Sequence, residues 1–153
     1  MTVSFGNVDV VDAVLGPGVQ IIRPSNIYGC RIGDRTFVGP FCEIQRDVII
    51  GRDCRIQSHS FICELVTMGD GCFIGHGAMF INDTFAAGGP ARGDRTRLRA
   101  TKLGNDVSIG SNATLLPVEI VDGVVVGAGA VVTKDLLVKG IYGGNPAKLL
   151  RRL

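Results

Sequence analysis

An apolar residue recurs at every sixth position through the middle of the chain, and this period limits the fold more than any other feature. The series runs through nine positions without a slip: Ile32, Val38, Ile44, Ile50, Ile56, Ile62, Met68, Ile74 and Phe80. Four residues after each anchor the side chain is small or β-branched: Thr36, Cys42, Val48, Cys54, Ser60, Val66, Cys72 and Ala78. This period fits neither an α-helix nor an alternating hairpin strand. It predicts short strands joined by turns, with both repeat positions facing inward.

Three such six-residue sides make one coil, and stacked coils pair as parallel strands about 4.8 Å apart. Glycine follows many anchors, where we expect it to relax the corner backbone. The series resumes after a gap, slips once by one position, and has a looser first coil: Leu103, Ile109, Leu115, Ile120, Val126 and Val132, with Val14, Ile21 and Ile27 upstream. The sequence therefore predicts an all-β fold, a parallel β-helix of about six coils that forms one domain over residues 1–153.

Composition excludes several classes of protein. With 46% apolar and 20% charged residues the chain is not disordered, and its 22 glycines keep no collagen period. The longest apolar run, Val124–Val132, is too short for a membrane helix, and residues 1–13 lack the basic region of a signal peptide. Five cysteines without a disulfide-like spacing predict a reducing, cytoplasmic compartment. With no CxxC motif or Cys/His cluster, no metal is expected.

The repeat is lost over residues 81–102, which we interpret as a loop insertion. Arg92 to Lys102 carries five basic residues and one acidic residue, and Lys134 to Leu153 has the same balance. A long irregular stretch inside a compact domain is usually functional or disordered. The basic segments are either solvated surface or sites for phosphate groups. Nucleic acid is not an expected partner, because the chain lacks a continuous basic face with stacking aromatic residues.

The two histidines, His59 and His76, come shortly before the loop. Ser58 precedes His76 by one full coil length and should stack on it in the next coil, as Glu64 should on Asn82. An imidazole can accept a proton at neutral pH, so either histidine is a candidate general base. Backbone N–H groups beside glycine are accessible donors for a developing oxyanion. The chain has no GxSxG motif, so a serine nucleophile of that kind is not expected.

The unbroken hexads resemble the hexapeptide-repeat acyltransferases, which fold as left-handed parallel β-helices. Ile56 to Asp83 is similar to the N-acetyltransferases that act on amino-sugar nucleotides of bacterial polysaccharide pathways, particularly on a 3-amino group. The resemblance implies an acetyl-CoA donor, a nucleotide-linked amino sugar as acceptor, and a homotrimer. It also implies that the loop helps to build the active site against a neighbouring subunit.

The resemblance also assigns candidate site residues. Either His59 or His76 is the candidate base; several relatives have Asn at the Ser58-His59 position, so the role of His59 stays open. Candidates for the acceptor site are Ser58, Glu64, Asn82, Asp83, Arg92 and Arg95. Candidates for the coenzyme A site are Ser111, Gly127 and Ala128 for the pantetheine arm, with Lys134, Lys148 and Arg151 for the phosphates.

The last residues predict a short helix over about 146–153. Asn145 is a suitable N-cap and Pro146 a suitable first helical residue, and the helix would cover the open edge of the final coil.

Other functions remain open at this point. O-acetylation of a sugar or serine is the nearest rival, followed by a non-catalytic structural or binding subunit. The carbonic anhydrases of the family use three histidines, whereas this chain has two. The sequence does not reveal the nucleotide, the sugar, the amine position or the acyl-chain length.

Overall fold

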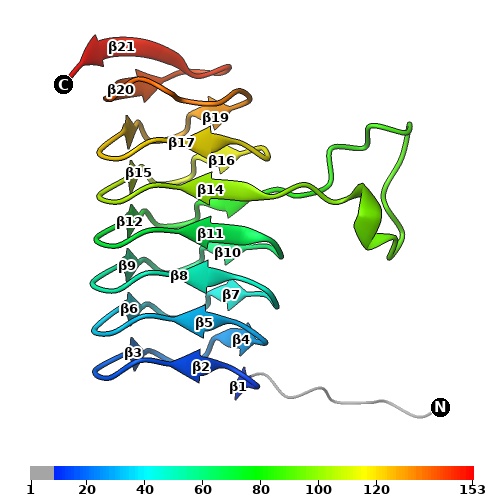
Figure 1. Cartoon of the computed structure of the whole chain (residues 1–153), viewed down its shortest axis with the longest axis vertical. Coiled ribbons are helices and arrows are strands. Elements are labelled where there is room, and N and C mark those ends of the chain that lie inside the picture. Colours follow the sequence, from blue (N-terminus) through cyan, green and yellow to red (C-terminus); the bar gives the residue numbers. More distant parts are fainter. Residues whose placement is uncertain (1–8) are drawn as a thin grey trace.

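The computed structural model describes residues 9–153; residues 1–8, where the N-terminal segment considered above begins, lie outside the described part. The chain winds into a tall stack of three-sided coils (Figure 1). Each complete coil contributes one short strand to each of three sheets, and these strands pair in parallel from coil to coil, so the predicted all-β parallel β-helix is confirmed. Within residues 9–153 the structure has no helix that could cross a membrane.

The three sheets follow one another around each coil. Sheet A contains β1 (Val10–Val11), β4 (Asn26–Tyr28), β7 (Glu43–Ile44), β10 (Phe61–Ile62), β13 (Met79–Phe80), β16 (Thr114–Leu115) and β19 (Val131–Val132). Sheet B contains β2 (Val14–Leu15), β5 (Arg31–Ile32), β8 (Ile49–Ile50), β11 (Val66–Met68), β14 (Thr101–Leu103) and β17 (Glu119–Ile120). Sheet C contains β3 (Gln20–Ile21), β6 (Phe37–Val38), β9 (Arg55–Ile56), β12 (Phe73–Ile74), β15 (Ser108–Ile109), β18 (Val125–Val126), β20 (Gly140–Gly143) and β21 (Lys148–Arg152).

Two sequence predictions need correction. The coils number about seven rather than six, because sheet A alone stacks seven strands. The predicted C-terminal helix over 146–153 is wrong: Lys148–Arg152 forms β21, which pairs antiparallel with β20. The physical reason is that the edge of β20 presents unpaired N–H and C=O groups, which a strand satisfies directly and a helix does not.

The anchors form the core of the coils. Ile44, Ile56, Ile62 and Ile74 are fully buried, as are the later anchors Ile109 and Leu115. Middle coils pair at the full coil length of three hexads, as between Phe73 and Arg55. Coils after the loop are shorter by a single position, as the pairing of Ser108 with Val125 shows. The slip of one position in the sequence repeat, between Leu115 and Ile120, accounts for this shorter coil.

Glycine after an anchor has a different role from the one expected. The left-handed backbone of the turns is often carried by other residues, including Arg35, Asp53 and His59, with φ of 56°, 57° and 65°. The glycines instead allow neighbouring coils to stack closely. A Cβ on Gly75, for example, would lie 2.5 Å from the backbone nitrogen of Ser111 in the next coil, closer than non-bonded atoms approach.

The loop leaves the stack between β13 and β14 and extends to its side (Figure 1). Its one regular element is a short 3₁₀ helix, η1 (Arg95–Arg97), which Asp94 caps by accepting a hydrogen bond from Thr96 N. Three columns of turns connect the sheets. The turns after sheet A, one of which is the loop, form the loop corner. The turns after sheet B, with Asp53 and Asp70, form the carboxylate corner, and those after sheet C, with His59 and His76, form the histidine corner.

Candidate functional site

The histidine corner places predicted catalytic and cofactor residues in one column. Ser58, His76, Ser111 and Ala128 occupy the same position in four successive turns. Backbone hydrogen bonds fix the stacking: Gly77 N donates to Ser58 O at 3.0 Å, Asn112 N to His76 O at 2.8 Å, and Gly129 N to Ser111 O at 2.8 Å. Residues distant in the sequence therefore lie side by side at this corner.

Ser58 and His76 form a hydrogen-bonded pair. Ser58 Oγ lies 2.9 Å from His76 Nδ1, and the His76 side chain is exposed. When Nδ1–H donates to the serine oxygen, Nε2 keeps a lone pair directed away from the pair. This arrangement suits a proton acceptor, because the second nitrogen is oriented while remaining accessible.

His59 has different surroundings from His76. Its ring stacks on Phe41, with the centroids 4.9 Å apart and the planes inclined by 29°. Within residues 9–153 no hydrogen bond orients the His59 imidazole. The two histidines therefore share the corner but not the environment: one is held by a hydroxyl and the other by an aromatic ring.

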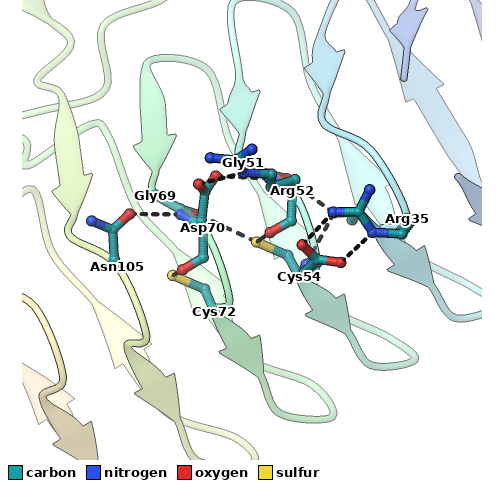
Figure 2. Close-up of polar contacts among 10 residues, drawn as sticks. Arg35, Gly51, Arg52, Cys54, Gly69, Asp70, Cys72 and Asn105 are labelled. Carbon is teal, nitrogen blue, oxygen red and sulfur yellow. Dashed lines mark hydrogen bonds and ion pairs between the residues drawn. The ribbon is translucent and has the colours of Figure 1, made fainter. Parts of the chain in front are cut away.

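Backbone N–H groups of the described residues are capped at the middle turns of the carboxylate corner but not at the later turns of the histidine corner. At the carboxylate corner the N–H of Arg52 donates to Asp70 Oδ1 at 3.0 Å and the N–H of Asp70 donates to Asn105 Oδ1 at 2.9 Å, each across to the following coil (Figure 2). The N–H of Asn105 donates in the same way to Asp122 Oδ1 at 2.8 Å. At the histidine corner, by contrast, the described part of the chain offers no acceptor to the N–H of Ser111 or Ala128. These donors are available to a ligand, whereas the N–H of Gly127 is bonded to Tyr142 O.

Ion pairs complete the carboxylate corner. Arg35 contacts both oxygens of Asp53 at 2.7 Å, and Arg52 Nε lies 2.9 Å from Asp70 Oδ2 (Figure 2). The hydrogen bond from Arg35 lowers the pKa of Asp53, and hydrogen bonds from the backbone and side chain of Arg52 lower the pKa of Asp70. These groups satisfy one another, so this corner is structural.

Asn82 and Asp83 shape the start of the loop. Asn82 Nδ2 donates to Glu64 O at 3.2 Å, in line with the stacking predicted from their spacing. Asp83 accepts hydrogen bonds from Ala91 N at 2.6 Å and Phe85 N at 3.0 Å, and these bonds lower the pKa of its carboxyl group. Asp83 is thus an ionised residue that holds the loop in a tight curve.

Glu64 connects the loop to the coils. Its carboxylate, only 13% exposed, lies 2.9 Å from Arg46 Nε and 3.0 Å from Arg95 Nε. Arg95 also pairs with Asp47. Arg95, a sequence candidate for the acceptor site, is therefore engaged with the protein itself, whereas Arg92 is exposed and has no such pairing within residues 9–153.

A mostly apolar pocket of about 430 Å³ lies between the loop and sheet A. Its lining comprises Phe61, Phe80, Ile81, Asn82, Asp83, Thr84, Phe85 and Leu116. Phe61 comes just after His59 in the chain, so the pocket begins close to the histidine corner and ends at the loop corner. The outer surface of sheet A thus connects the histidines with Asn82 and Asp83.

The basic cofactor candidates are dispersed. Lys148 begins β21 just after the last turn of the histidine corner, and Arg151 lies farther along that strand. Lys134 follows β19 at the loop corner, on the other side of sheet A. All three are exposed. The structure places only Lys148 near the line that runs from Ser58 to Ala128.

The cysteines are buried side chains of the core. Cys42, Cys54 and Cys72 occupy the inward position, as predicted, and their thiols approach carbonyls of the next coil at 3.2–3.3 Å. Burial raises the pKa of Cys30 to about 11 and of Cys63 to about 12, so neither is a thiolate nucleophile at neutral pH. Residues 9–153 hold no group of three side chains arranged to bind a metal ion.

Sequence reasoning missed Phe41, Arg46 and Asp47. The signal was available for two of them: Phe41 precedes His59 by one coil length, and Arg46 precedes Glu64 by the same spacing. The sequence did not predict the free N–H groups of the histidine corner, because they depend on which turns lack a side-chain oxygen that accepts a hydrogen bond.

Comparison with known proteins supports the repeat. The sequence model described as bacterial transferase hexapeptide (six repeats) matches residues 29–64, and that of the hexapeptide repeat of succinyl-transferase matches residues 100–134. The bifunctional protein GlmU of Acidithiobacillus ferrooxidans is 32% identical over 134 residues, which is 82% of this chain and 29% of the relative. A chloramphenicol acetyltransferase of Agrobacterium fabrum is 51% identical over 53 residues, or 34% of this chain and 25% of the relative. The chain thus spans under a third of these relatives.

Solved structures share the fold. PerB of Caulobacter crescentus, in complex with CoA and GDP-perosamine, has a TM-score of 0.67 and 21% identity, covering 89% of this chain and 57% of PerB. A variant of AntD, an N-acyltransferase of Bacillus cereus in complex with dTDP and coenzyme A, has a TM-score of 0.70 and 23% identity, covering 94% and 83%. At these identities the likeness shows the fold alone. Together with the two repeat matches and the stacked parallel coils, it shows that the chain is a hexapeptide-repeat β-helix similar to those of bacterial transferases.

Proposed function

We propose that this protein is an acetyl-CoA-dependent N-acetyltransferase that acts on a nucleotide-linked amino sugar, with a 3-amino group favoured. The observation that carries the proposal is the histidine corner, where the Ser58–His76 pair lies directly below turns whose backbone N–H groups have no acceptor among residues 9–153. A proton acceptor and a row of free donors are the two elements that direct acyl transfer requires. PerB and AntD, which share the fold, were solved with coenzyme A and with nucleotide ligands.

His76 is the proposed general base. In the reaction the sugar amine attacks the thioester carbonyl and gives its proton to His76 Nε2. As the carbon–sulfur bond breaks, the coenzyme A thiolate leaves and takes this proton from the imidazolium, which returns His76 to its neutral form. Ser58 acts as a positioning residue, because its hydroxyl holds Nδ1. His59, the second candidate, is stacked on Phe41 and lacks such a partner among the described residues.

Coenzyme A is the proposed donor and lies along the later turns of the histidine corner. The N–H groups of Ser111 and Ala128 suit the amide carbonyls of the pantetheine arm, and Gly127 puts no side chain in its path. Lys148, next along the corner, suits a phosphate. Lys134 and Arg151 remain weaker candidates because they lie away from this line. No metal is required by this mechanism.

The acceptor is proposed to bind over sheet A, with Asn82 and Asp83 at the pocket of about 430 Å³. Glu64 contributes indirectly, since it anchors the loop through Arg95. The loop extends beyond its own coils (Figure 1), and Phe85 at its start is 59% exposed. A homotrimer, in which a neighbouring copy covers this face and Arg92 meets the nucleotide, accounts for both features. A reducing cytoplasm suits the five free, buried thiols.

The test is release of free thiol from acetyl-CoA in the presence of GDP-, UDP- or dTDP-linked amino sugars. We expect release that depends on the acceptor and that the His76→Asn variant largely loses. Release with hydroxyl acceptors alone would identify an O-acetyltransferase instead. No release with any amine or hydroxyl acceptor, together with no binding of coenzyme A by calorimetry, would identify a non-catalytic subunit.

A further inference from the structure

The histidine corner carries an aromatic pair that the proposed chemistry does not use. Phe41 and His59 occupy equivalent positions in successive turns, and their rings stack at 4.9 Å, within the range favoured for aromatic pairs. Phe41 is 56% exposed and His59 is also exposed. The pair forms a flat apolar platform on the surface, next to the Ser58–His76 pair.

The backbone of this pair is unusual for such side chains. Phe41 and His59 have φ of 60° and 65°, in the left-handed region that bulky residues rarely adopt. The next turns have Gly77, Asn112 and Gly129 at this position, which are residues suited to that conformation. Because Arg35 and Asp53 adopt the same backbone in other turns, it is the exposure of the large Phe41 ring, which contributes little to the core, that points to a role in binding.

A pocket of about 350 Å³ lies beside Phe41. Its lining is Pro24, Ser25, Asn26, Phe41, Cys42 and Glu43. His59 already covers one face of the Phe41 ring. A ligand in the pocket would therefore contact Phe41 from the side toward Pro24. Asn26 and Glu43 supply amide and carboxylate groups at the edge of this apolar slot. A planar ring with polar atoms on its rim fits both the slot and its edge.

The platform also lies on one particular side of the base. Along the histidine corner the order is Phe41, His59, His76, Ser111 and Ala128, so the turns proposed for coenzyme A lie beyond His76 in the opposite direction. A ligand on the platform therefore lies on the side of His76 opposite to the turns proposed for coenzyme A. We infer that Phe41 and His59 form the subsite that stacks the nucleobase of the nucleotide-linked acceptor, with Asn26 and Glu43 contacting the edge of the base; this inference rests on the proposed function.

The absence of tryptophan from the chain gives a direct binding test. The Phe41→Trp variant carries a single tryptophan in the platform, and GDP and UDP are the probes. We expect saturable fluorescence quenching by the nucleotides and none by pyrophosphate, which lacks a base. The matched control is Phe73→Trp, at a phenylalanine of sheet C that is 41% exposed, and it should not respond to the same probes.

Kinetics provide the second test. Phe41→Gly removes the ring and suits the left-handed backbone, so this variant should fold. We expect its KM for the nucleotide sugar to rise about tenfold or more, as for loss of one stacking contact, with kcat and the KM for acetyl-CoA unchanged. Phe41→Tyr should restore the KM.

Two results would overturn the subsite. One is the absence of saturable quenching by GDP and UDP together with an unchanged KM in Phe41→Gly. The other is quenching by coenzyme A but not by these nucleotides, which would assign the platform to the donor. Wild-type thiol release reports on the proposed function separately: an active wild type with an unresponsive platform refutes the subsite alone, whereas a responsive platform without thiol release refutes acetyl transfer.

Discussion

At the residue scale, the two histidines differ in what holds the ring. His76 has its Nδ1 at 2.9 Å from Ser58 Oγ, whereas His59 rests on Phe41 at a left-handed φ of 65°. An oriented imidazole is a better general base than one that is only stacked, because proton transfer depends on the direction of the lone pair. The hydrogen bond between Ser58 and His76, which are one coil length apart, therefore identifies the candidate base better than the proximity of the two histidines does.

The first prediction separates the two rings. His76→Asn should lower kcat about a hundredfold or more, as expected for loss of a general base, and Ser58→Ala should lower it less. His59→Asn should leave kcat close to wild type, because Asn tolerates the left-handed conformation. Steady-state thiol release at saturating substrates measures all three variants. Equal losses in the two histidine variants would show that the assignment to His76 alone is wrong.

A buried hydroxyl supplies the second prediction. Thr101 is 1% exposed and its Oγ1 has no hydrogen-bond partner among the described residues, although its strand pairs with β11 through Val66. Thr101→Val should raise the free energy of unfolding by about 1 kcal/mol, since an unsatisfied polar group is replaced by an isosteric apolar one.

Thr36 is the matched control for Thr101. It is equally buried at an inward position, but its Oγ1 donates to Gly51 O at 2.9 Å and accepts from Cys54 N at 3.0 Å. Thr36→Val should therefore destabilise the protein by about 1–3 kcal/mol. Denaturant unfolding measures both variants, and a destabilised Thr101→Val would contradict the argument.

At the scale of elements, Arg95 holds the loop to the coils through two carboxylates, those of Glu64 and Asp47. Glu64 lies between Arg46 and Arg95, and Arg95 also reaches Asp47. The contact joins η1 to turns that precede the loop by many residues. It keeps the start of the loop, with Asn82 and Asp83, next to sheet A, where the pocket forms.

The third prediction tests this attachment. Arg95→Ala should increase amide hydrogen exchange over residues 84–99, because the ion pairs that close the loop are lost. Arg92→Ala is the control, since Arg92 is exposed and unpaired within residues 9–153. Exchange followed by mass spectrometry compares the two variants; equal protection in both would show that the ion pairs do not hold the loop.

At the scale of the whole molecule, the carboxylate corner links successive coils through hydrogen bonds and ion pairs. In the folded protein Arg35 lowers the pKa of Asp53 and Arg52 lowers that of Asp70. A carboxyl group with a lowered pKa stabilises the fold at pH values above its ordinary pKa of 3.8. That contribution is lost as the pH falls through the lower, folded-state value.

The fourth prediction follows from the direction of these two pKa shifts. The melting temperature should fall as the pH decreases from about 5 toward about 2, and Asp70→Asn should make the decline shallower. Asp106→Asn is the control: Asp106 lies at the same corner, is exposed, and makes no ion pair among the described residues. Calorimetry over this pH range measures the slopes, and identical slopes for wild type and Asp70→Asn would refute the argument.

The repeat itself predicted the coils because each anchor contributes to burial within a few residues of its own position. It therefore gave the inward cysteines, the short coil after Leu115, and the stacking of Ser58 on His76 and of Asn82 on Glu64. The C-terminal helix failed because Asn145 and Pro146 describe a local preference, while the neighbouring strand β20 required a hydrogen-bonding partner. The glycines after the anchors allow close contact with the next coil, whereas the sequence predicted that they relax the corner backbone.

The sequence by itself determined a stack of three-sided coils and the columns that the repeat creates at each coil length. Only the tertiary structure decided in which columns the backbone N–H groups are hydrogen-bonded and in which they have no acceptor among the described residues. At the carboxylate corner, side chains of one coil cap the N–H groups of the coil before it, whereas Ser111 and Ala128 of the histidine corner are left uncapped within the described residues. The tertiary structure also directed the Arg95 side chain onto Glu64 and Asp47. Such contacts depend on side-chain directions across coils, which periodicity does not encode.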